Sequence, residues 1–255
     1  MRITRAVVPS LFTVLNMFCG FLSIVNASKG DFLQASWLII LAAGFDALDG
    51  VMARITKSSS QFGVEIDSLS DVVSFGAAPA FLVYQVHLHT LDGFGILLSS
   101  LLMIFAGLRL ARFNVNLVGF EKDHFSGLPT PASALTVASF MINYWGETTG
   151  LGGAAVVLPY LAVVLSLLMV SKVKYDTLPR ISRRSFQREP WKFIFLALAV
   201  VVVFVTAGEA IFPLFVLFIA LGIVRYVGST VKHILHHEEK RKEEEGAEPT
   251  SVDIS

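Results

Sequence analysis

Four aspartates fall within 26 residues of this chain, in a stretch that reads Asp46-Ala-Leu-Asp-Gly-Val-Met-Ala-Arg54 and, eight residues later, Gly63-Val-Glu-Ile-Asp-Ser-Leu-Ser-Asp71. Apolar runs of membrane-spanning length flank the stretch on both sides. Ionisable residues inside membrane segments are costly, so by default they mark function. The stretch therefore predicts a membrane protein with a functional site where two helices meet the membrane surface.

The spacing of the acids predicts that their side chains converge. Asp46 and Asp49 are three residues apart and share one face of a helix, whereas Asp67 and Asp71 are four apart and share one face of the next helix. A short turn joins the two helices, so the two faces can meet. We expect four carboxylates to gather at one side of the bilayer.

Such a cluster needs compensating charge, and hard divalent cations with oxygen ligands are its natural partners. Metal-bound carboxylates often handle phosphate substrates. Gly50, Ala53 and Gly63 keep the helix surfaces thin for a bulky ligand, and Arg54 adds a phosphate donor. The alternative is that helix-end acids pair with Arg54 and Lys57, which suits one or two acids but not four at two regular spacings.

The composition agrees with a membrane protein. Of 255 residues, 54% are hydrophobic and only 16% are charged, and the net charge is zero. The hydrophobicity excludes an intrinsically disordered chain, and the single cysteine, Cys19, excludes a disulfide scaffold. Because there is no basic excess, a nucleic-acid partner is not expected.

We predict an all-α polytopic protein with eight spans, near 10–28, 31–53, 64–86, 92–110, 129–147, 151–171, 191–207 and 210–230. The weakest division lies between the fifth and sixth spans, at 146–153. With eight spans, nineteen of the 20 Lys and Arg residues fall on one side of the membrane and only Lys29 on the other. Positive residues concentrate in cytoplasmic loops, so both termini and the acids are expected to be cytoplasmic. We expect the first run to stay on the chain, because it is long and holds polar residues unlike those of a signal peptide.

The acidic stretch resembles the signature of the CDP-alcohol phosphotransferases, Asp-x2-Asp-Gly-x2-Ala-Arg-x8-Gly-x3-Asp-x3-Asp, at every defined position. The resemblance implies an integral membrane enzyme with a six-helix core, generally a homodimer. Such enzymes move a substituted phosphate from a CDP-linked group to an alcohol and release CMP. The resemblance covers the first six helices, so the last two would be additions to the core.

The resemblance also implies roles for individual residues. Asp46, Asp49, Asp67 and Asp71 would hold one or two divalent metals, Mg²⁺ or Mn²⁺, on the diphosphate. Asp71 would also be the general base for the acceptor hydroxyl, whereas Gly50, Ala53, Arg54 and Gly63 would shape the CDP pocket. The implied division is a catalytic membrane domain over 1–175, a basic cytoplasmic loop over 176–190, two further spans within 191–232 and a charged tail over 233–255. Residues 236–255 are expected to be solvated and disordered.

Other segments resemble the branch of the family that makes phosphatidylserine; they are residues 9–16, 74–80, 109–114, 125–132 and 170–175. This resemblance implies CDP-diacylglycerol and L-serine as substrates and membrane lipids as surroundings. In an archaeon the lipid would carry ether chains. The turn 127–129 is expected to shape the pocket.

Two pairs of residues are candidates for substrate contact. Arg109 and Arg112 are three apart at a helix end, where a guanidinium suits the serine carboxylate; we favour Arg112, and the alternative is that both anchor the helix among head groups. Thr13 and Asn16 either contact the cytidine and its ribose or make ordinary interhelical hydrogen bonds.

Two other functions remain open. A sister enzyme would use glycerol 3-phosphate or an inositol phosphate and would need a basic cluster for the acceptor phosphate. A cation transporter would use the acids as an ion path, but it leaves Gly50, Arg54 and Gly63 unexplained.

Overall fold

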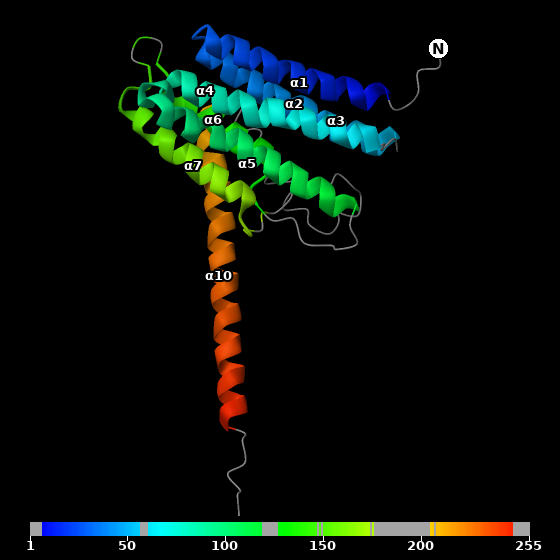
Figure 1. Cartoon of the computed structure of the whole chain (residues 1–255), viewed down its shortest axis with the longest axis vertical. Helices are drawn as coiled ribbons and strands as arrows, with labels where there is room; N and C mark the ends of the chain where they lie inside the picture. Colours follow the sequence, from blue (N-terminus) through cyan, green and yellow to red (C-terminus); the bar gives the residue numbers. More distant parts are fainter. Residues whose placement is uncertain are drawn as a thin grey trace, which may run out of the picture.

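The structure is a computed structural model that describes residues 7–56, 61–118, 127–146, 148, 150–173, 175, 205, 206 and 208–246, with the side chains of 7–10, 54, 56, 116–118 and 231–246 excepted. The described residues are helical, and their one β-type contact is an isolated bridge between Gly146 and Gly150. Figure 1 shows a bundle of helices from which the last helix projects. The all-α prediction is confirmed.

In the described part of the chain the bundle consists of α1 (Val7–Ser28), α2 (Phe32–Thr56), α3 (Gln61–Asp71), the π-helix η1 (Val72–Ala77), α4 (Ala78–Val86), the 3₁₀ turn η2 (Leu88–Leu91), α5 (Asp92–Val118), α6 (Thr130–Tyr144) and α7 (Val157–Val170). A second 3₁₀ turn, η3 (Gly152–Val156), leads into α7. Elements α3, η1 and α4 follow one another without a break, so they form one membrane-spanning rod with a π-helical middle. α1 and α2 form an antiparallel pair whose turn contains Gly30 at φ +88°.

In the described part of the chain, six helical segments are long and apolar enough to cross a membrane: 11–28, 32–53, 61–86, 88–115, 152–170 and 211–230. They correspond to the first four predicted spans, the sixth and the eighth. The seventh predicted span, 191–207, and the basic loop over 176–190 lie outside the described residues apart from residues 205 and 206.

The fifth predicted span differs from the other spans. α6 has only 15 residues, about 22 Å at 1.5 Å per residue, and falls short of the roughly 30 Å of bilayer hydrocarbon. It begins after Pro129 and ends at Trp145, where the backbone turns to an extended conformation. Ten of its residues, including Val137 and Met141, are buried among neighbouring helices. A helix enclosed by protein does not need to match the bilayer thickness, which explains the short length.

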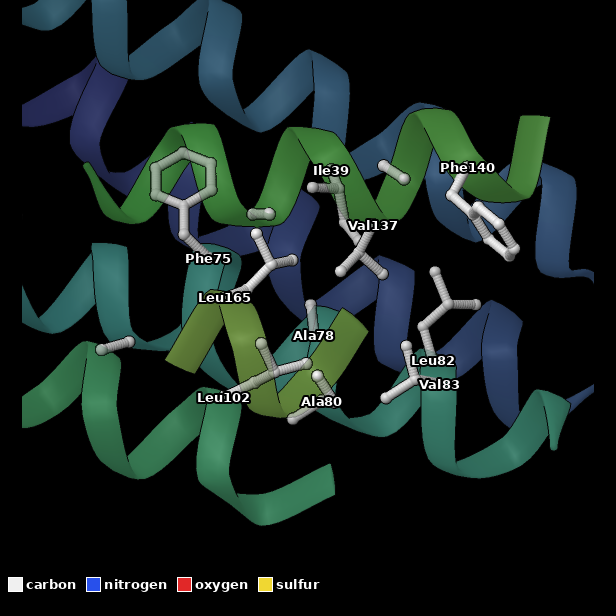
Figure 2. Close-up of a cluster of buried hydrophobic side chains, with 14 of the residues drawn as sticks. Ile39, Phe75, Ala78, Ala80, Leu82, Val83, Leu102, Val137, Phe140 and Leu165 are labelled. Carbon is white, nitrogen blue, oxygen red and sulfur yellow. The ribbon is translucent and has the colours of Figure 1, made fainter. Parts of the chain in front are cut away.

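The core gathers around α6. Figure 2 shows Val137 and Phe140 of α6 facing apolar side chains from other elements, namely Ile39 of α2, Phe75 of η1, Leu82 and Val83 of α4, Leu102 of α5 and Leu165 of α7. Small residues of α6 such as Ala134 and Ala138 are fully buried, which lets the neighbouring backbones approach. This packing makes the first six predicted helices one body.

The last helix, α10 (Ile211–Gly246), starts on the core and then leaves it (Figure 1). The start of the helix is held by the Asn143 amide, which donates to the carbonyl of Glu209 just before α10 at 2.7 Å, and by Phe212, whose ring meets that of Phe140 edge to face. The helix continues to Gly246, so the expected disorder is wrong for residues 236–246. Residues 236–245 contain no Gly or Pro and are rich in Glu, Lys and Arg, which are good helix formers.

Candidate active site

Helix α1 contacts the rod of α3 and η1 through hydroxyl groups. Ser70 donates to the carbonyl of Thr13 at 3.0 Å, and Ser74 donates to the carbonyl of Asn16 at 2.8 Å. Gly20 continues this line, because a Cβ there would lie 2.6 Å from the Cα of Ser74. The two backbones therefore touch at Gly20, and this contact fixes the position of Thr13 and Asn16 along the rod relative to the aspartates.

Three aspartates converge where α2 meets α3. Carboxylate oxygens of Asp46, Asp67 and Asp71, here called the acid cluster, all lie within 4.8 Å of one another. Asp71 is buried, and the other two are half-buried. The rod changes to a π-helix directly after Asp71, a rare conformation that is frequent at functional sites. The predicted convergence is confirmed for these three acids.

The fourth aspartate, Asp49, is held separately. The Thr13 hydroxyl donates a short hydrogen bond to its carboxylate. Asp49 still interacts electrostatically with Asp46 and Asp67, so it adds negative charge at the edge of the acid cluster. The sequence predicted four equivalent acids, whereas the structure distinguishes three that share one point from one that α1 holds.

Asn16 has the corresponding role for Asp71. Its side-chain amide donates to Asp71 Oδ1 at 3.3 Å, and its own Oδ1 is buried without a hydrogen-bond partner among the described residues. Thr13 and Asn16 thus make interhelical hydrogen bonds, which is one of the two alternatives that their spacing left open. A contact with the nucleotide stays a prediction.

Positive charge reaches the site from α5. Arg109 is half-buried, donates to the Thr130 hydroxyl at 2.8 Å, and interacts electrostatically with Asp71. Its Nε is buried with no hydrogen-bond partner in the described part of the chain. Arg112 is exposed and donates to the carbonyl of Val170 at 3.4 Å. Arg109 therefore lies beside the acids, whereas Arg112 contacts the end of α7.

Two polar contacts at the site escaped sequence reasoning. Ser68, between two of the aspartates, hydrogen-bonds Asn114 of α5, with the Asn114 amide 2.9 Å from the hydroxyl. The hydroxyl of Thr130, the first residue of α6, accepts a hydrogen bond from Arg109. Asn114 and Thr130 fall within the segments 109–114 and 125–132 that resemble the family branch, and that was the available signal.

The remaining predicted residues lie on the same two helices. Gly50 and Ala53 are in the last two turns of α2, and Gly63 is in the first turn of α3. The Arg54 side chain lies outside the described residues. These placements keep the predicted CDP-binding residues next to the acid cluster but assign no contact to a ligand.

The acid cluster has the chemistry of a divalent cation site. Its donors are carboxylate oxygens only, they come from two helices, and they lie close enough to reach one ion. Hard cations such as Mg²⁺ take this donor type. The residues present therefore fit a divalent metal.

Comparison with known proteins agrees with the site. The sequence model described as CDP-alcohol phosphatidyltransferase matches residues 6–168. The chain is 34% identical over 233 residues to the CDP-diacylglycerol–serine O-phosphatidyltransferase of Helicobacter pylori strain J99, covering 89% of this chain and 94% of the relative. It is 40% identical over 169 residues to the archaetidylserine synthase of Methanothermobacter thermautotrophicus, covering 66% and 68%. It is 31% identical over 184 residues to the CDP-diacylglycerol–serine O-phosphatidyltransferase of Bacillus subtilis, covering 72% and 98%. The chain that carries this acid cluster belongs to the CDP-alcohol phosphatidyltransferase family.

Proposed function

We propose that this protein transfers a phosphatidyl group from CDP-diacylglycerol to the hydroxyl of L-serine, giving phosphatidylserine and CMP. The observation that carries the proposal is the acid cluster beside Arg109, in a chain that matches most of the length of the Helicobacter pylori relative. A lipid donor suits the site, because the acids lie on helices that are long and apolar enough to cross a membrane.

The acid cluster would hold the divalent metal, with Asp49 adding charge beside it. A bound Mg²⁺ or Mn²⁺ supplies Lewis-acid chemistry, since it offsets the negative charge of the diphosphate. Gly50, Ala53, Arg54 and Gly63 would bind the CDP part of the donor. Thr13 and Asn16 would contact the same part of the donor from α1.

Asp71 would act as the general base. The serine oxygen attacks the phosphorus attached to diacylglycerol while Asp71 takes the hydroxyl proton. The bond from that phosphorus to the bridging oxygen breaks, and CMP leaves with the electron pair. Because a carboxylate is a weak base for an alcohol, much of the rate enhancement must come from positioning and charge. Asn16 contributes positioning by holding one oxygen of Asp71.

Arg109 and Arg112 would bind the serine carboxylate. Arg109 has the better position, since it lies next to the proposed base and has a buried Nε without a partner among the described residues. A guanidinium presents donors in a planar fork that matches a carboxylate. Binding there would place the serine hydroxyl within reach of Asp71.

We also propose that both termini and the active site face the cytoplasm and that the enzyme is a homodimer. The distribution of Lys and Arg supports the orientation, and the family resemblance supports the dimer. Cysteine replacements test the orientation: Lys29→Cys should react with an impermeant reagent in intact cells, and Lys240→Cys in the charged tail should react only after lysis. Light scattering of the purified protein tests the dimer, and a monomer mass would reject it.

The decisive experiment is CMP release by purified protein with CDP-diacylglycerol and Mg²⁺ or Mn²⁺, with and without L-serine. Serine-dependent CMP together with a new aminophospholipid is the expected result. CMP only with glycerol 3-phosphate or an inositol phosphate would keep the family and reject the acceptor. Turnover only with an ether-linked donor would reject the ester lipid, and metal flux without CMP would indicate a transporter.

A further inference from the structure

Helix α10 lies against the segment that follows α7, through the side chain of Tyr175. The Tyr175 ring packs on the backbone of α10 at Gly222, where a Cβ would lie 2.6 Å from Cδ1 and 3.0 Å from Cζ of the ring. Phe218, one turn earlier on the same face, lies 5.5 Å away between ring centroids. Tyr175 is only 8% exposed, so its ring is enclosed by the residues around it.

The segment that carries Tyr175 also holds the turn at residues 127–129, before α6. The Gly127 amide donates to the carbonyl of Val173 at 2.8 Å, and the Leu128 amide donates to the carbonyl of Leu168 at 2.9 Å. Gly127 has φ +94°, and a Cβ there would lie 2.9 Å from the carbonyl carbon of Met169. The turn is therefore fixed by backbone contacts with the end of α7 and with the residues just before Tyr175.

The turn leads directly to the arginines. Thr130 follows it as the first residue of α6 and accepts the hydrogen bond from Arg109. Arg112 donates to the carbonyl of Val170, on the same segment that holds the turn. A displacement of residues 170–175 would therefore move the partners of both arginines together.

We propose that α10 positions the acceptor side of the active site through Tyr175, so that the C-terminal helix sets the affinity for the alcohol substrate. This inference rests on the proposed function, because it takes Arg109 and Arg112 as the acceptor site. Tyr175 is a positioning residue here and does not contact the reacting atoms. Burial raises the pKa of its phenol, so the ring stays uncharged and packs as an apolar group.

The comparisons are consistent with a modulating role for α10. The family match ends at residue 168, before Tyr175 and α10. The Bacillus subtilis relative is matched over 98% of its own length and yet covers only 72% of this chain. More than a quarter of this chain is therefore outside that match.

The test compares two glycines of α10 in the full-length enzyme. Gly222→Leu pushes a side chain into the Tyr175 ring, whereas Gly228→Leu is the matched control, because nothing lies within 4 Å of a Cβ at Gly228. With CDP-diacylglycerol and serine, Gly222→Leu should raise the KM for serine about tenfold and change the KM for the lipid less than about twofold. Gly228→Leu should leave both KM values unchanged. Equal changes in the two KM values for Gly222→Leu, or no change, would overturn the proposal.

A second variant covers the case in which Gly222→Leu does not fold. Tyr175→Ala removes the same contact without overfilling the space, and it should raise the KM for serine in the same selective way. Unchanged serine KM in folded Tyr175→Ala would reject the positioning role.

Hydrogen exchange separates this inference from the proposed function. The amides of Gly127 and Leu128 should exchange faster in Gly222→Leu than in the wild type, and at wild-type rates in Gly228→Leu, whatever the substrate proves to be. If the wild-type protein releases no CMP with serine but this pattern holds, the link through Tyr175 stands and the acceptor is wrong. Unchanged exchange in Gly222→Leu would reject the link itself.

Discussion

The Asn16 amide donates a 3.3 Å hydrogen bond to the Asp71 carboxylate across 55 residues of sequence. The backbone carbonyl of Asn16 is also fixed, because it accepts from Ser74, one turn of the rod beyond Asp71. Helix α1 is thereby tied to both the side chain and the backbone of the element that carries the proposed base. The orientation of Asp71 depends on α1 as much as on its own helix.

Replacing Asn16 by alanine should lower turnover about 10- to 100-fold, because a carboxylate that loses its orienting donor spends less time in the reactive geometry. A rise in the KM for CDP-diacylglycerol as well would support the proposed contact of Asn16 with the donor. Steady-state CMP release measures both quantities. Asn26→Ala is the control, since the Asn26 side-chain amide donates within α1, to the carbonyl of Leu22. Wild-type turnover in Asn16→Ala would remove this role.

Replacing Asp71 by asparagine should abolish turnover and leave much of the binding of the CDP-lipid, because the amide cannot take the proton from the acceptor hydroxyl. Turnover is measured as CMP release, and binding as retention of labelled CDP-diacylglycerol by the purified variant. Asp31→Asn, an exposed acid before α2, serves as the control for loss of one carboxylate. Near-normal turnover in Asp71→Asn would exclude it as the base.

The sequence predicted the helices and the acids because both depend on local spacing. The lengths of the apolar runs located five of the first six spans. The three- and four-residue spacings of the acids placed Asp46, Asp67 and Asp71 on facing helix surfaces. It did not predict the short, enclosed α6, since a run of apolar residues does not tell whether lipid or protein surrounds it.

Contacts between distant segments were beyond the sequence. The separation of Asp49 from the other acids depends on Thr13, 36 residues away, and the π-helix after Asp71 leaves no pattern that hydrophobic spacing can detect. The high charge of residues 236–246 led to the prediction of disorder. The same charge is compatible with a solvated helix, which the local preference of these residues favours.

Replacing Arg112 by alanine should raise the KM for serine far more than the KM for CDP-diacylglycerol, because a carboxylate partner is lost while the lipid site is kept. The two KM values come from varying each substrate in turn. Lys29→Ala, in the turn between α1 and α2, removes a charge away from the acid cluster and should change neither. Equal rises in both KM values for Arg112→Ala would exclude it from the serine site and leave Arg109 as the candidate.

Divalent metal should stabilise the folded protein even without substrate. Binding to the native state alone adds about 2.7 kcal/mol at a metal concentration 100 times Kd, which raises the melting temperature. Thermal unfolding after chelation, with and without added Mg²⁺ or Mn²⁺, measures the shift. Asp67→Asn should lose most of the shift, and Asp92→Asn, an exposed acid at the start of α5, should keep it. A shift of the same size in Asp67→Asn would contradict a metal site at the acid cluster.

The close approach of α1 and η1 at Gly20 should make this position intolerant of any side chain. In Gly20→Ala the new Cβ would lie 2.6 Å from the Cα and 2.9 Å from the Cβ of Ser74, so the two helices must separate. Overpacking of this kind typically costs about 1–3 kcal/mol of the free energy of unfolding.

Gly44→Ala is the matched control, because it adds the same methyl group to a helix with nothing within 4 Å. Both variants gain helix propensity, which alone would raise stability by up to about 1 kcal/mol, so the difference between their melting temperatures isolates the clash. Since separation also pulls Asn16 away from Asp71, Gly20→Ala should lose turnover beyond its loss of folded protein, and equal melting temperatures for the two variants would refute the contact.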